Sequence, residues 1–405
     1  MFDRPSGGSA AVLVSLDFGG AGYEDSLQEL HHLVTSAGMT VKEVVEGRRA
    51  KPDAALFIGS GKAEELKASL LGVEAQVAVF NHDLSPAQQR NLEKLLECRV
   101  IDRTGLILDI FAQRAKSHEG KLQVELAQLE HLATRLIRGW THLERQKGGI
   151  GVRGGPGETQ LELDRRQIRD RVKLLKEKLQ KLKAQRGQQR RSRQRSGVMS
   201  VSLVGYTNAG KSTLFNRLTQ SSAFVADQLF ATLDTTSRKM YIPNCGPVVV
   251  SDTVGFIRHL PHTLVEAFGA TLEEAVQADV LLHIVDITSP AREEQALEVN
   301  RVLAEIGVQE VPQILVMNKI DGTDMQPSIE RDEYGKIRKV WVSAQAGSGM
   351  ELIRQALSER FPEQHQSIIP SPWQGEGQDG GRMVQVITTQ PPHQPPPARG
   401  EGVTI

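Results

Sequence analysis

The sequence predicts an α/β protein in which two domains of alternating strands and helices are joined by a helical hairpin. Three observations support this fold class. Residues 11–103 alternate short apolar runs with helical patterns, residues 104–197 repeat leucine at helical spacing, and residues 201–218 place a glycine-bounded loop between an apolar strand and a helix. We therefore expect a small α/β subdomain over 1–103, an antiparallel hairpin over 104–197 and an α/β domain with a mostly parallel sheet over 198–361.

Residues 362–405 differ in composition from the rest of the chain. They are rich in proline and glycine and contain too little apolar surface to order themselves, so we expect a largely disordered tail. A short edge strand at residues 383–387 is the one element that their pattern suggests.

Length, charge and cysteine content bound the class of protein. A chain of 405 residues exceeds one ordinary core, and its formal net charge of zero gives no overall electrostatic bias. Cys98 and Cys245 lack the spacing of metal ligands or of a disulfide framework, which suits a reducing cytosol. The first ten residues have no signal-peptide core, and no apolar run approaches the ~20 residues of a membrane span. We expect a cytoplasmic monomer without a membrane span.

The N-terminal 103 residues read as a small parallel sheet with helices between its strands. Expected strands lie at 11–16, 40–45, 54–58, 77–80 and 99–101. Expected helices lie at 24–37, after residues 59–62 through Leu71, and at 86–97. Gly59-Ser-Gly-Lys62 resembles part of a phosphate-binding loop, but its spacing is too short, so we favour a structural turn. The alternative is a separate ATP site in this domain, which would suit an RNA-remodelling enzyme.

Two leucine-rich stretches form the expected hairpin. The pattern over 104–143 is helical, and a second helix from Asp164 spaces its apolar residues by four, three, four and three, the period of a coiled coil. Residues 148–157 lie between the two stretches, and six of these ten residues are glycine. The simplest arrangement is a pair of antiparallel helices with the glycine segment near the connecting tip.

The second helix of the hairpin is strongly basic. Residues 165–195 contain fourteen Lys or Arg and only two acids, Asp170 and Glu177. A charged run is often just a solvated surface, but a run of nearly uniform sign repels itself and favours a polyanionic partner. Because no aromatic residue interrupts this run, we expect contacts with a nucleic-acid backbone instead of base stacking.

The most informative motif is the pattern G-x-x-x-x-G-K-S that begins at Gly205. Its loop wraps a polyphosphate with backbone N–H groups, and the following helix directs its positive end at the anion. Lys211 would add a charge at the outer phosphates, and Ser212 would place its hydroxyl on Mg²⁺. The alternative is a glycine turn that binds nothing. The predicted binding residues are Gly205, Tyr206, Thr207, Asn208, Ala209, Gly210, Lys211, Ser212 and Thr213.

Two later motifs complete a nucleotide site. Asp252 and Gly255 follow an apolar strand, where the carboxylate can hold the Mg²⁺ shell and the glycine N–H can reach the γ-phosphate. Asp321, in Asn318-Lys-Ile-Asp321, can accept two hydrogen bonds from guanine, whereas adenine would leave this carboxylate unpaired. The sequence therefore predicts GTP as the nucleotide. Its predicted base contacts are Asn318, Lys319, Asp321, Ser343 and Ala344.

The full motif set resembles that of the translation-factor-related GTPases and looks like the HflX family, a relative of the Obg GTPases. The resemblance covers about residues 10–362. It rests on the motifs already described and on Phe230-Ala-Thr-Leu-Asp234, Asp252-Thr-Val-Gly-Phe-Ile257, Phe57-Ile-Gly-Ser-Gly-Lys-Ala-Glu-Glu-Leu66, Gly139-Trp140 and Gly157-Glu-Thr-Gln-Leu-Glu162. It implies a Mg²⁺-dependent GTP hydrolase that binds the large ribosomal subunit and its rRNA and separates stalled or idle 70S particles. The proline-rich tail matches no feature of the family.

The resemblance also implies residue roles. By its position, Thr232 is the first-switch threonine that senses Mg²⁺ and the γ-phosphate, although Thr235 and Thr236 lie close enough to compete for that role. We therefore expect Lys211, Thr232 and Gly255 to take part in hydrolysis, with Ser212 and Thr232 as metal ligands. The rival function is a non-catalytic RNA-binding protein whose GTP site only stabilises its fold.

Two substitutions within the motifs bear on catalysis. Phe256 follows the glycine of D-x-x-G, where many small GTPases carry a glutamine that orients water, and a phenyl ring cannot do this. Either another group supplies the function or hydrolysis waits for a partner, and a purely hydrophobic contact at Phe256 is compatible with both. In related GTPases an asparagine at the position of Asn208 helps to bind K⁺ beside the phosphates, but asparagine also suits tight turns.

Overall fold

The computed structural model describes residues 8–20, 22–138, 160–195, 198–220, 229–258, 260–261, 264 and 269–361 of the 405-residue chain. The α/β fold class is confirmed, with a mostly parallel sheet in the second α/β domain. Gly139-Trp140, residues 148–157 and residues 383–387 lie outside the described residues. Within the described residues, no helix is long and apolar enough to cross a membrane.

The N-terminal domain is built on a four-stranded parallel sheet with the order β2-β1-β3-β4. Ser85 starts one of its helices as expected, because its hydroxyl accepts the N–H of Gln88 while the Gln88 side chain accepts the N–H of Ser85. The elements are β1 (Ala10–Asp17), α1 (Tyr23–Ser36), β2 (Thr40–Arg48), α2 (Ser60–Gly72), β3 (Val77–Phe80), α3 (Pro86–Leu96) and β4 (Arg99–Ile101).

The strand expected at residues 54–58 is wrong. The Asp53 carboxylate accepts the N–H groups of Ala55 and Leu56, each at 2.8 Å, and this turn brings Phe57 back to pair with Asp53 in an isolated bridge. The loop then enters α2 through Gly59. The Arg49 guanidinium fills the space beside this glycine and donates to the carbonyl of Ile58 at 2.8 Å. These contacts are those of a structural turn.

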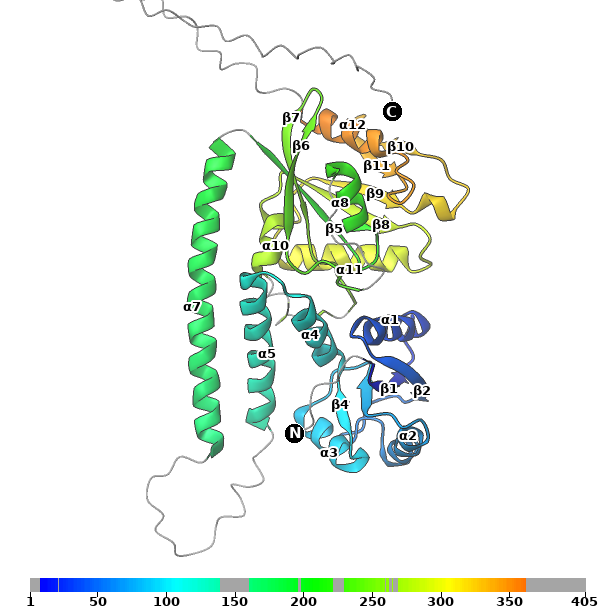
Figure 1. Ribbon diagram of the computed structural model, residues 1–405. Coiled ribbons are helices and arrows are strands. Elements are labelled where there is room, and N and C mark those ends of the chain that lie inside the picture. The colour runs from blue at the N-terminus through cyan, green and yellow to red at the C-terminus, as the bar shows by residue number, and fades with distance from the viewer. Residues whose placement is uncertain are drawn as a thin grey trace, which may run out of the picture. The chain divides into compact units, whose positions relative to one another are not determined.

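The hairpin contains a break that its sequence pattern does not predict. Helices α4 (Arg103–Arg114) and α5 (His118–Arg138) replace the single stretch expected over 104–143. The second arm, α7 (Gln160–Arg195), begins four residues earlier than expected. Figure 1 shows α5 and α7 side by side, and Leu175 of α7 is fully buried against α5. The leucine seam therefore packs as the coiled-coil spacing predicts.

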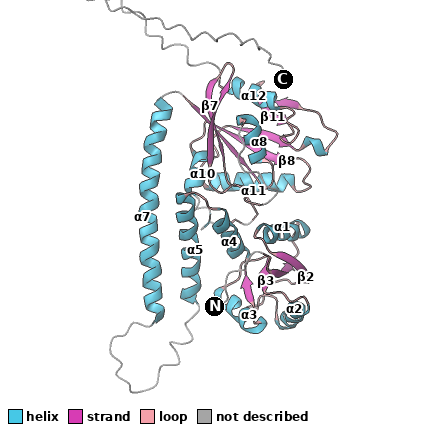
Figure 2. Cartoon of the chain, in the orientation of Figure 1, coloured by secondary structure: helices cyan, strands magenta, loops and turns pink. Residues whose placement is uncertain are grey.

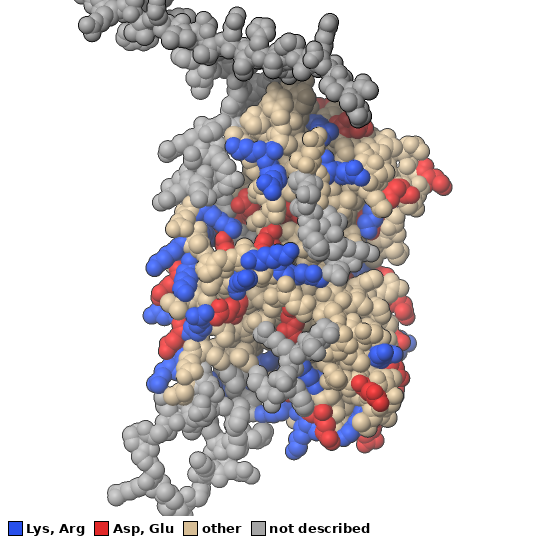
Figure 3. Space-filling model, viewed as in Figure 1, with Lys and Arg blue, Asp and Glu red and all other residues tan. Residues whose placement is uncertain are grey.

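Part of the basic charge on α7 is used within the hairpin. Arg171, Lys176 and Arg186 form ion pairs with Glu125, Glu130 and Glu119 of α5, at 2.6, 2.8 and 2.6 Å. Figure 3 accordingly shows acidic side chains among the basic ones along this edge. The uniformly basic surface expected from α7 alone is therefore corrected, because α5 supplies acids that the sequence of one helix cannot reveal. The exposed basic side chains of α7 that have no such pair include Arg169, Lys173, Lys178, Lys181 and Lys183.

The second α/β domain contains a seven-stranded sheet with the order β10-β11-β9-β8-β5-β7-β6. Its central strands are parallel, and the outer pairs β10–β11 and β6–β7 are antiparallel. Figure 2 shows helices and strands of this domain in the orientation of Figure 1. The strands are β5 (Met199–Gly205), β6 (Thr236–Ile242), β7 (Gly246–Asp252), β8 (Val280–Asp286), β9 (Gln313–Asn318), β10 (Ser328–Arg331) and β11 (Ile337–Trp341).

Two hydrophobic cores lie on opposite faces of this sheet because successive strand residues point to opposite sides. In β5, Leu203 belongs to a core with helices α8 (Lys211–Thr219) and α12 (Met350–Arg360), whereas Val204 belongs to a core with α10 (Gly269–Val276) and α11 (Arg292–Glu305). The second core continues without interruption into buried residues of α1 and α4. The N-terminal domain and the second α/β domain therefore share one apolar interior.

Candidate functional site

The candidate site is formed where β5 ends and α8 begins. Gly210 occupies the left-handed region at φ 93°, and a Cβ atom there would come within 2.2 Å of the Asn318 Nδ2 atom. Only glycine fits this close approach. The following residue, Lys211, begins α8, so the free N–H groups of the helix end face the loop.

A cavity of about 510 Å³ opens beside this loop. It brings together eleven of the residues that the sequence predicts for the site: Thr207, Asn208, Gly210, Lys211, Ser212, Thr213, Thr232, Gly255, Asn318, Lys319 and Ala344. The predicted residues that do not line it are Gly205, Tyr206, Ala209, Asp252, Asp321 and Ser343. The motifs from four separate parts of the chain thus converge on one cavity.

Lys211 carries the principal positive charge of the cavity. Its ammonium group is buried and donates to the carbonyl oxygens of Gly205 at 3.0 Å and Tyr206 at 2.6 Å. Burial lowers the pKa of Lys211 to about 8, and the nearby Asp252 carboxylate opposes this shift. A phosphate group that entered the cavity would favour the charged form of this lysine.

Three side-chain oxygens converge next to Lys211. The Ser212 hydroxyl lies 2.7 Å from the Thr232 hydroxyl and 2.6 Å from Asp252 Oδ2, and Thr232 lies 3.0 Å from the same carboxylate oxygen. Burial raises the pKa of Asp252, and among the described residues no donor reaches its buried Oδ1 atom. Two hydroxyls around a buried carboxylate are hard oxygen ligands, so this donor set fits Mg²⁺. Of the three competing threonines, Thr232 is the one placed there.

The base-recognition motif serves two different purposes in the structure. The Asn318 side chain connects loops: its amide N–H donates to the Ala209 carbonyl at 2.8 Å, and its oxygen accepts the Ala344 N–H at 2.9 Å. Asp321, by contrast, is exposed, and its carboxylate accepts the Ser343 hydroxyl. Asp321 therefore has an exposed carboxylate, whereas Ser343 is buried beside it and Asn318 connects the surrounding loops.

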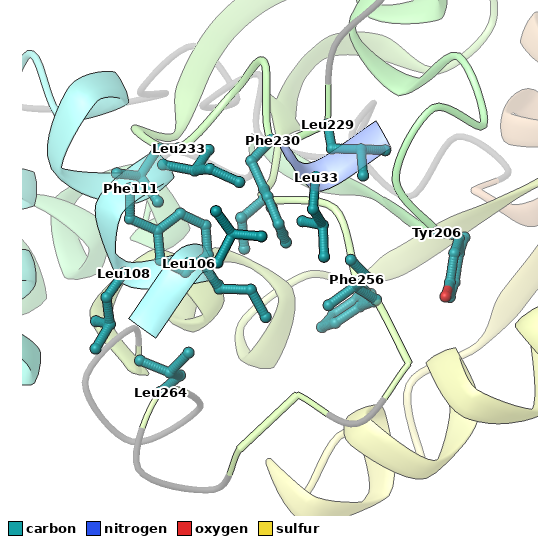
Figure 4. Packing of buried hydrophobic residues seen from close by; sticks show 14 of the residues in the cluster. Leu33, Leu106, Leu108, Phe111, Tyr206, Leu229, Phe230, Leu233, Phe256 and Leu264 are labelled. Atoms are coloured by element: carbon teal, nitrogen blue, oxygen red, sulfur yellow. The ribbon is translucent and has the colours of Figure 1, made fainter. Parts of the chain in front are cut away.

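Two motif side chains point away from the cavity. The Tyr206 hydroxyl donates to Glu29 of α1 and accepts the N–H of Arg258 at 2.8 Å. Tyr206 is therefore expected to contact a nucleotide only through its backbone. Phe256 has no exposed surface and lies in the cluster of Figure 4 with residues of α1 and α4, including Leu33 and Leu106. The structure supports the hydrophobic-contact interpretation of Phe256.

Sequence reasoning did not single out four residues that line the cavity. They are Phe230, Ala231, Thr253 and Gln345. Ala231, Thr253 and Gln345 stand next to a predicted site residue in the sequence, and Phe230 stands in the motif that contains Thr232. This closeness in sequence was the signal that could have found them. For Phe230, closeness in sequence would not have been enough. Its backbone adopts a positive φ of 56°, and the centroid of its ring lies 4.6 Å from that of the Phe111 ring.

Comparison with known proteins agrees with the geometry of the site. Three family models match: "GTP-binding GTPase N-terminal" over residues 24–112, "GTP-binding GTPase Middle Region" over 114–193, and "50S ribosome-binding GTPase" over 200–319. The chain is 56% identical to GTPase HflX of Escherichia coli K12 over 391 residues, covering 96% of this chain and 91% of that protein.

Further relatives give the same result. GTPase HflX of Magnetococcus marinus is 52% identical, with 82% of this chain and 76% of that protein covered. Among solved structures, one described as the complex of SsGBP and GDP is 25% identical with a TM-score of 0.50, covering 87% of this chain and 98% of that one.

Proposed function

The chain belongs to the HflX family of GTPases, and from this premise we propose that its nucleotide state controls binding to the large ribosomal subunit. It is a GTP hydrolase. In the proposed cycle the GTP-bound form binds the 50S subunit and its rRNA in the cytoplasm and separates stalled or idle 70S particles. We also propose that residues 1–103, 104–197, 198–361 and 362–405 are the functional units of this cycle.

This proposal rests on the position of the two segments that would sense the nucleotide, one around Thr232 and the other around Gly255. Phe230 and Phe256, which flank Thr232 and Gly255, are buried in the same cluster as α1 and α4. A GTPase whose sensing segments form the interface with a second domain can reorient that domain when its nucleotide changes. A protein that acts on a particle larger than itself needs such a change of domain orientation.

The proposed roles of the side chains follow from their positions. Backbone N–H groups of residues 205–213 bind the phosphates, Lys211 compensates their charge, and Gly255 offers its N–H to the γ-phosphate. Ser212 and Thr232 would hold Mg²⁺ with Asp252 nearby, and the metal would neutralise charge on the phosphate oxygens. Asp321 and Ser343 select guanine over adenine, while Asn318, Lys319 and Ala344 shape the base loops.

Turnover in the presence of ribosomal subunits tests the function. Because the Phe256 ring is buried away from the cavity, it offers no group that orients water, and we expect slow hydrolysis by the protein alone. Purified large subunits should accelerate GTP turnover and should sediment with the protein in a GTP analogue more than in GDP. Flat turnover and equal sedimentation would favour the rival, an RNA-binding protein whose GTP site is mainly regulatory.

A further inference from the structure

The segment 229–234 is attached to the N-terminal domain at several points. The backbone N–H of Leu229 donates to the Ser36 hydroxyl of α1 at 3.0 Å. The Phe230 ring meets the Phe111 ring of α4 edge-on, with centroids 4.6 Å apart. Between these contacts and the end of the segment, Thr232 turns its hydroxyl towards the cavity. One short segment therefore contacts both the nucleotide site and the N-terminal helices.

The last residue of this segment, Asp234, reaches the beginning of α5. Its carboxylate accepts the N–H groups of Lys116 and Ser117, each at 2.8 Å, and also the Ser117 hydroxyl. The N–H groups at a helix start have no partner within the helix, and a carboxylate there also interacts favourably with the helix dipole. Ser117 caps α5 locally, since its hydroxyl accepts the Gly120 N–H at 2.9 Å, and Asp234 from the other domain holds the two residues that lead into the helix.

The helix leaves space for this carboxylate. Gly120 lies in the first turn of α5, and a Cβ atom at this position would come within 2.1 Å of Asp234 Oδ1. Glycine is unfavourable inside a helix by about 1 kcal/mol relative to alanine. The contact with Asp234 accounts for its presence at this position.

The α5 helix does not end at this contact but carries the rest of the hairpin. Leu175 of α7 is fully buried against Leu122 and Leu126 of α5, and three ion pairs join the two helices along their length. A displacement at the start of α5 therefore moves both helices together.

We propose that Asp234 is a positioning residue that couples the nucleotide state sensed at Thr232 to the orientation of the α5–α7 hairpin. The γ-phosphate of GTP would hold Thr232 at the cavity, and its loss on hydrolysis would release Thr232. Asp234, which lies two residues further along the same segment, would shift with Thr232 and would move the start of α5. The purpose of this coupling rests on the proposed ribosomal function, but the coupling itself requires no ribosome. It can therefore be tested on the isolated protein.

The test is a distance measurement between spin labels in the full chain. Labels are placed at Gln180→Cys on α7 and at Tyr334→Cys in the exposed turn between β10 and β11, after Cys98→Ala and Cys245→Ala remove the native thiols. The distance distribution should differ between GDP and a non-hydrolysable GTP analogue. Asp234→Ala should reduce that difference to less than half, because it removes the carboxylate that accepts the Lys116 and Ser117 N–H groups.

The matched control is Asp53→Ala. Asp53 also accepts two backbone N–H groups, but it lies in a loop of the N-terminal domain away from residues 229–234. The control should retain the full nucleotide-dependent difference. A full difference in Asp234→Ala, or no difference in the unsubstituted protein, would overturn the proposal. So would a tenfold loss of nucleotide affinity in Asp234→Ala, since Asp234 would then belong to the binding site itself.

A second experiment tests the contact through thermal unfolding. Gly120→Ala should lower the melting temperature in the parent protein because the added methyl group collides with the Asp234 carboxylate. In an Asp234→Ala background the same change should be neutral or raise the melting temperature, because alanine favours helix. Equal losses in both backgrounds would mean that Asp234 does not occupy the space at Gly120. Neither experiment measures 70S separation, so a failure of the ribosomal function would be seen separately.

Discussion

At the residue scale, several polar side chains of the site form hydrogen bonds or ion pairs with other parts of the protein. The groups that remain for a nucleotide are backbone groups and a few charged side chains. Asn318 joins the phosphate loop to the loop after β11, and Lys319 forms an ion pair with Asp286 at 2.7 Å. The sequence motif predicts both residues for the site, and both line the cavity. It could not distinguish a residue that touches the base from one that orients a loop, because both are required at fixed spacing.

Base selectivity is predicted to depend on Asp321. Asp321→Asn should weaken GTP binding by on the order of 10²-fold and favour xanthine nucleotides, because an amide can donate where the carboxylate only accepted. Calorimetry with GTP and XTP measures the change. Asp324→Asn, at an exposed position three residues further on, is the control and should bind GTP normally. Unchanged GTP affinity in Asp321→Asn would contradict the assignment of Asp321 to guanine recognition.

Proton uptake is predicted from the environment of Lys211. Its pKa in the free protein is lowered to about 8 by burial, and phosphate binding should raise it. GTP affinity should therefore change little below pH 8 and fall above it, where binding must add a proton. Calorimetry in two buffers of different ionisation enthalpy should show clearly more proton uptake at pH 8.5 than at pH 7.0. Equal heats in both buffers at pH 8.5 would contradict this.

A monovalent-ion effect is predicted from Asn208, which lines the cavity in the left-handed region at φ 60°. This conformation is compatible with a turn role and with a K⁺ ligand, so the two must be separated experimentally. Asn208→Gly preserves the backbone conformation and removes the amide oxygen. If the amide binds K⁺, turnover with large subunits should be faster in K⁺ than in Na⁺, and Asn208→Gly should abolish the difference. A difference that persists in this variant would favour the turn role.

At the element scale, apolar periodicity predicted most helices and strands, and its failures have local causes. The strand expected at 54–58 is an apolar run that the Asp53 turn bends back on itself. The break between α4 and α5 is stabilised locally by Ser117, whose hydroxyl accepts the Gly120 N–H, and also by Asp234, which lies more than a hundred residues away and outside any local window of sequence. The edge strand β6 carries exposed residues along most of its length and lacks the apolar signal of a buried strand.

The hairpin seam supplies the prediction at this scale. Leu175→Ala should destabilise the α5–α7 packing by about 2–5 kcal/mol, because Leu175 is fully buried and its loss leaves a cavity. Urea denaturation monitored by circular dichroism gives the change, and GDP affinity should stay near its original value. The control is Leu174→Ala, at a neighbouring position that is 42% exposed, and it should cost less than about 1 kcal/mol. Equal losses of stability in Leu175→Ala and Leu174→Ala would contradict the packing of Leu175 between α5 and α7.

At the scale of the whole molecule, the two α/β domains are in contact through a shared apolar core and through segment 229–234. Sequence reasoning found each domain but not their interface, because residues such as Leu33 and Phe111 look like ordinary core positions of their own helices. Tyr206 and Phe256 show the same ambiguity: both belong to nucleotide motifs, and both direct their side chains into the interface. The site was therefore predictable from its motifs, whereas its connection to the rest of the molecule was not.

The most direct test of the proposed function is light scattering of 70S particles mixed with the protein. At saturating GTP the scattering should fall as particles separate into subunits, and GDP should leave it nearly unchanged. A variant shortened within residues 148–157 should bind GTP normally but separate particles more slowly, because we propose that this segment is the working tip of the hairpin. Charge reversal at Arg190, Arg191, Arg193 and Arg195 should instead weaken subunit binding, and that binding should fall steeply with salt. Scattering that stays constant with the unaltered protein and GTP would contradict the account.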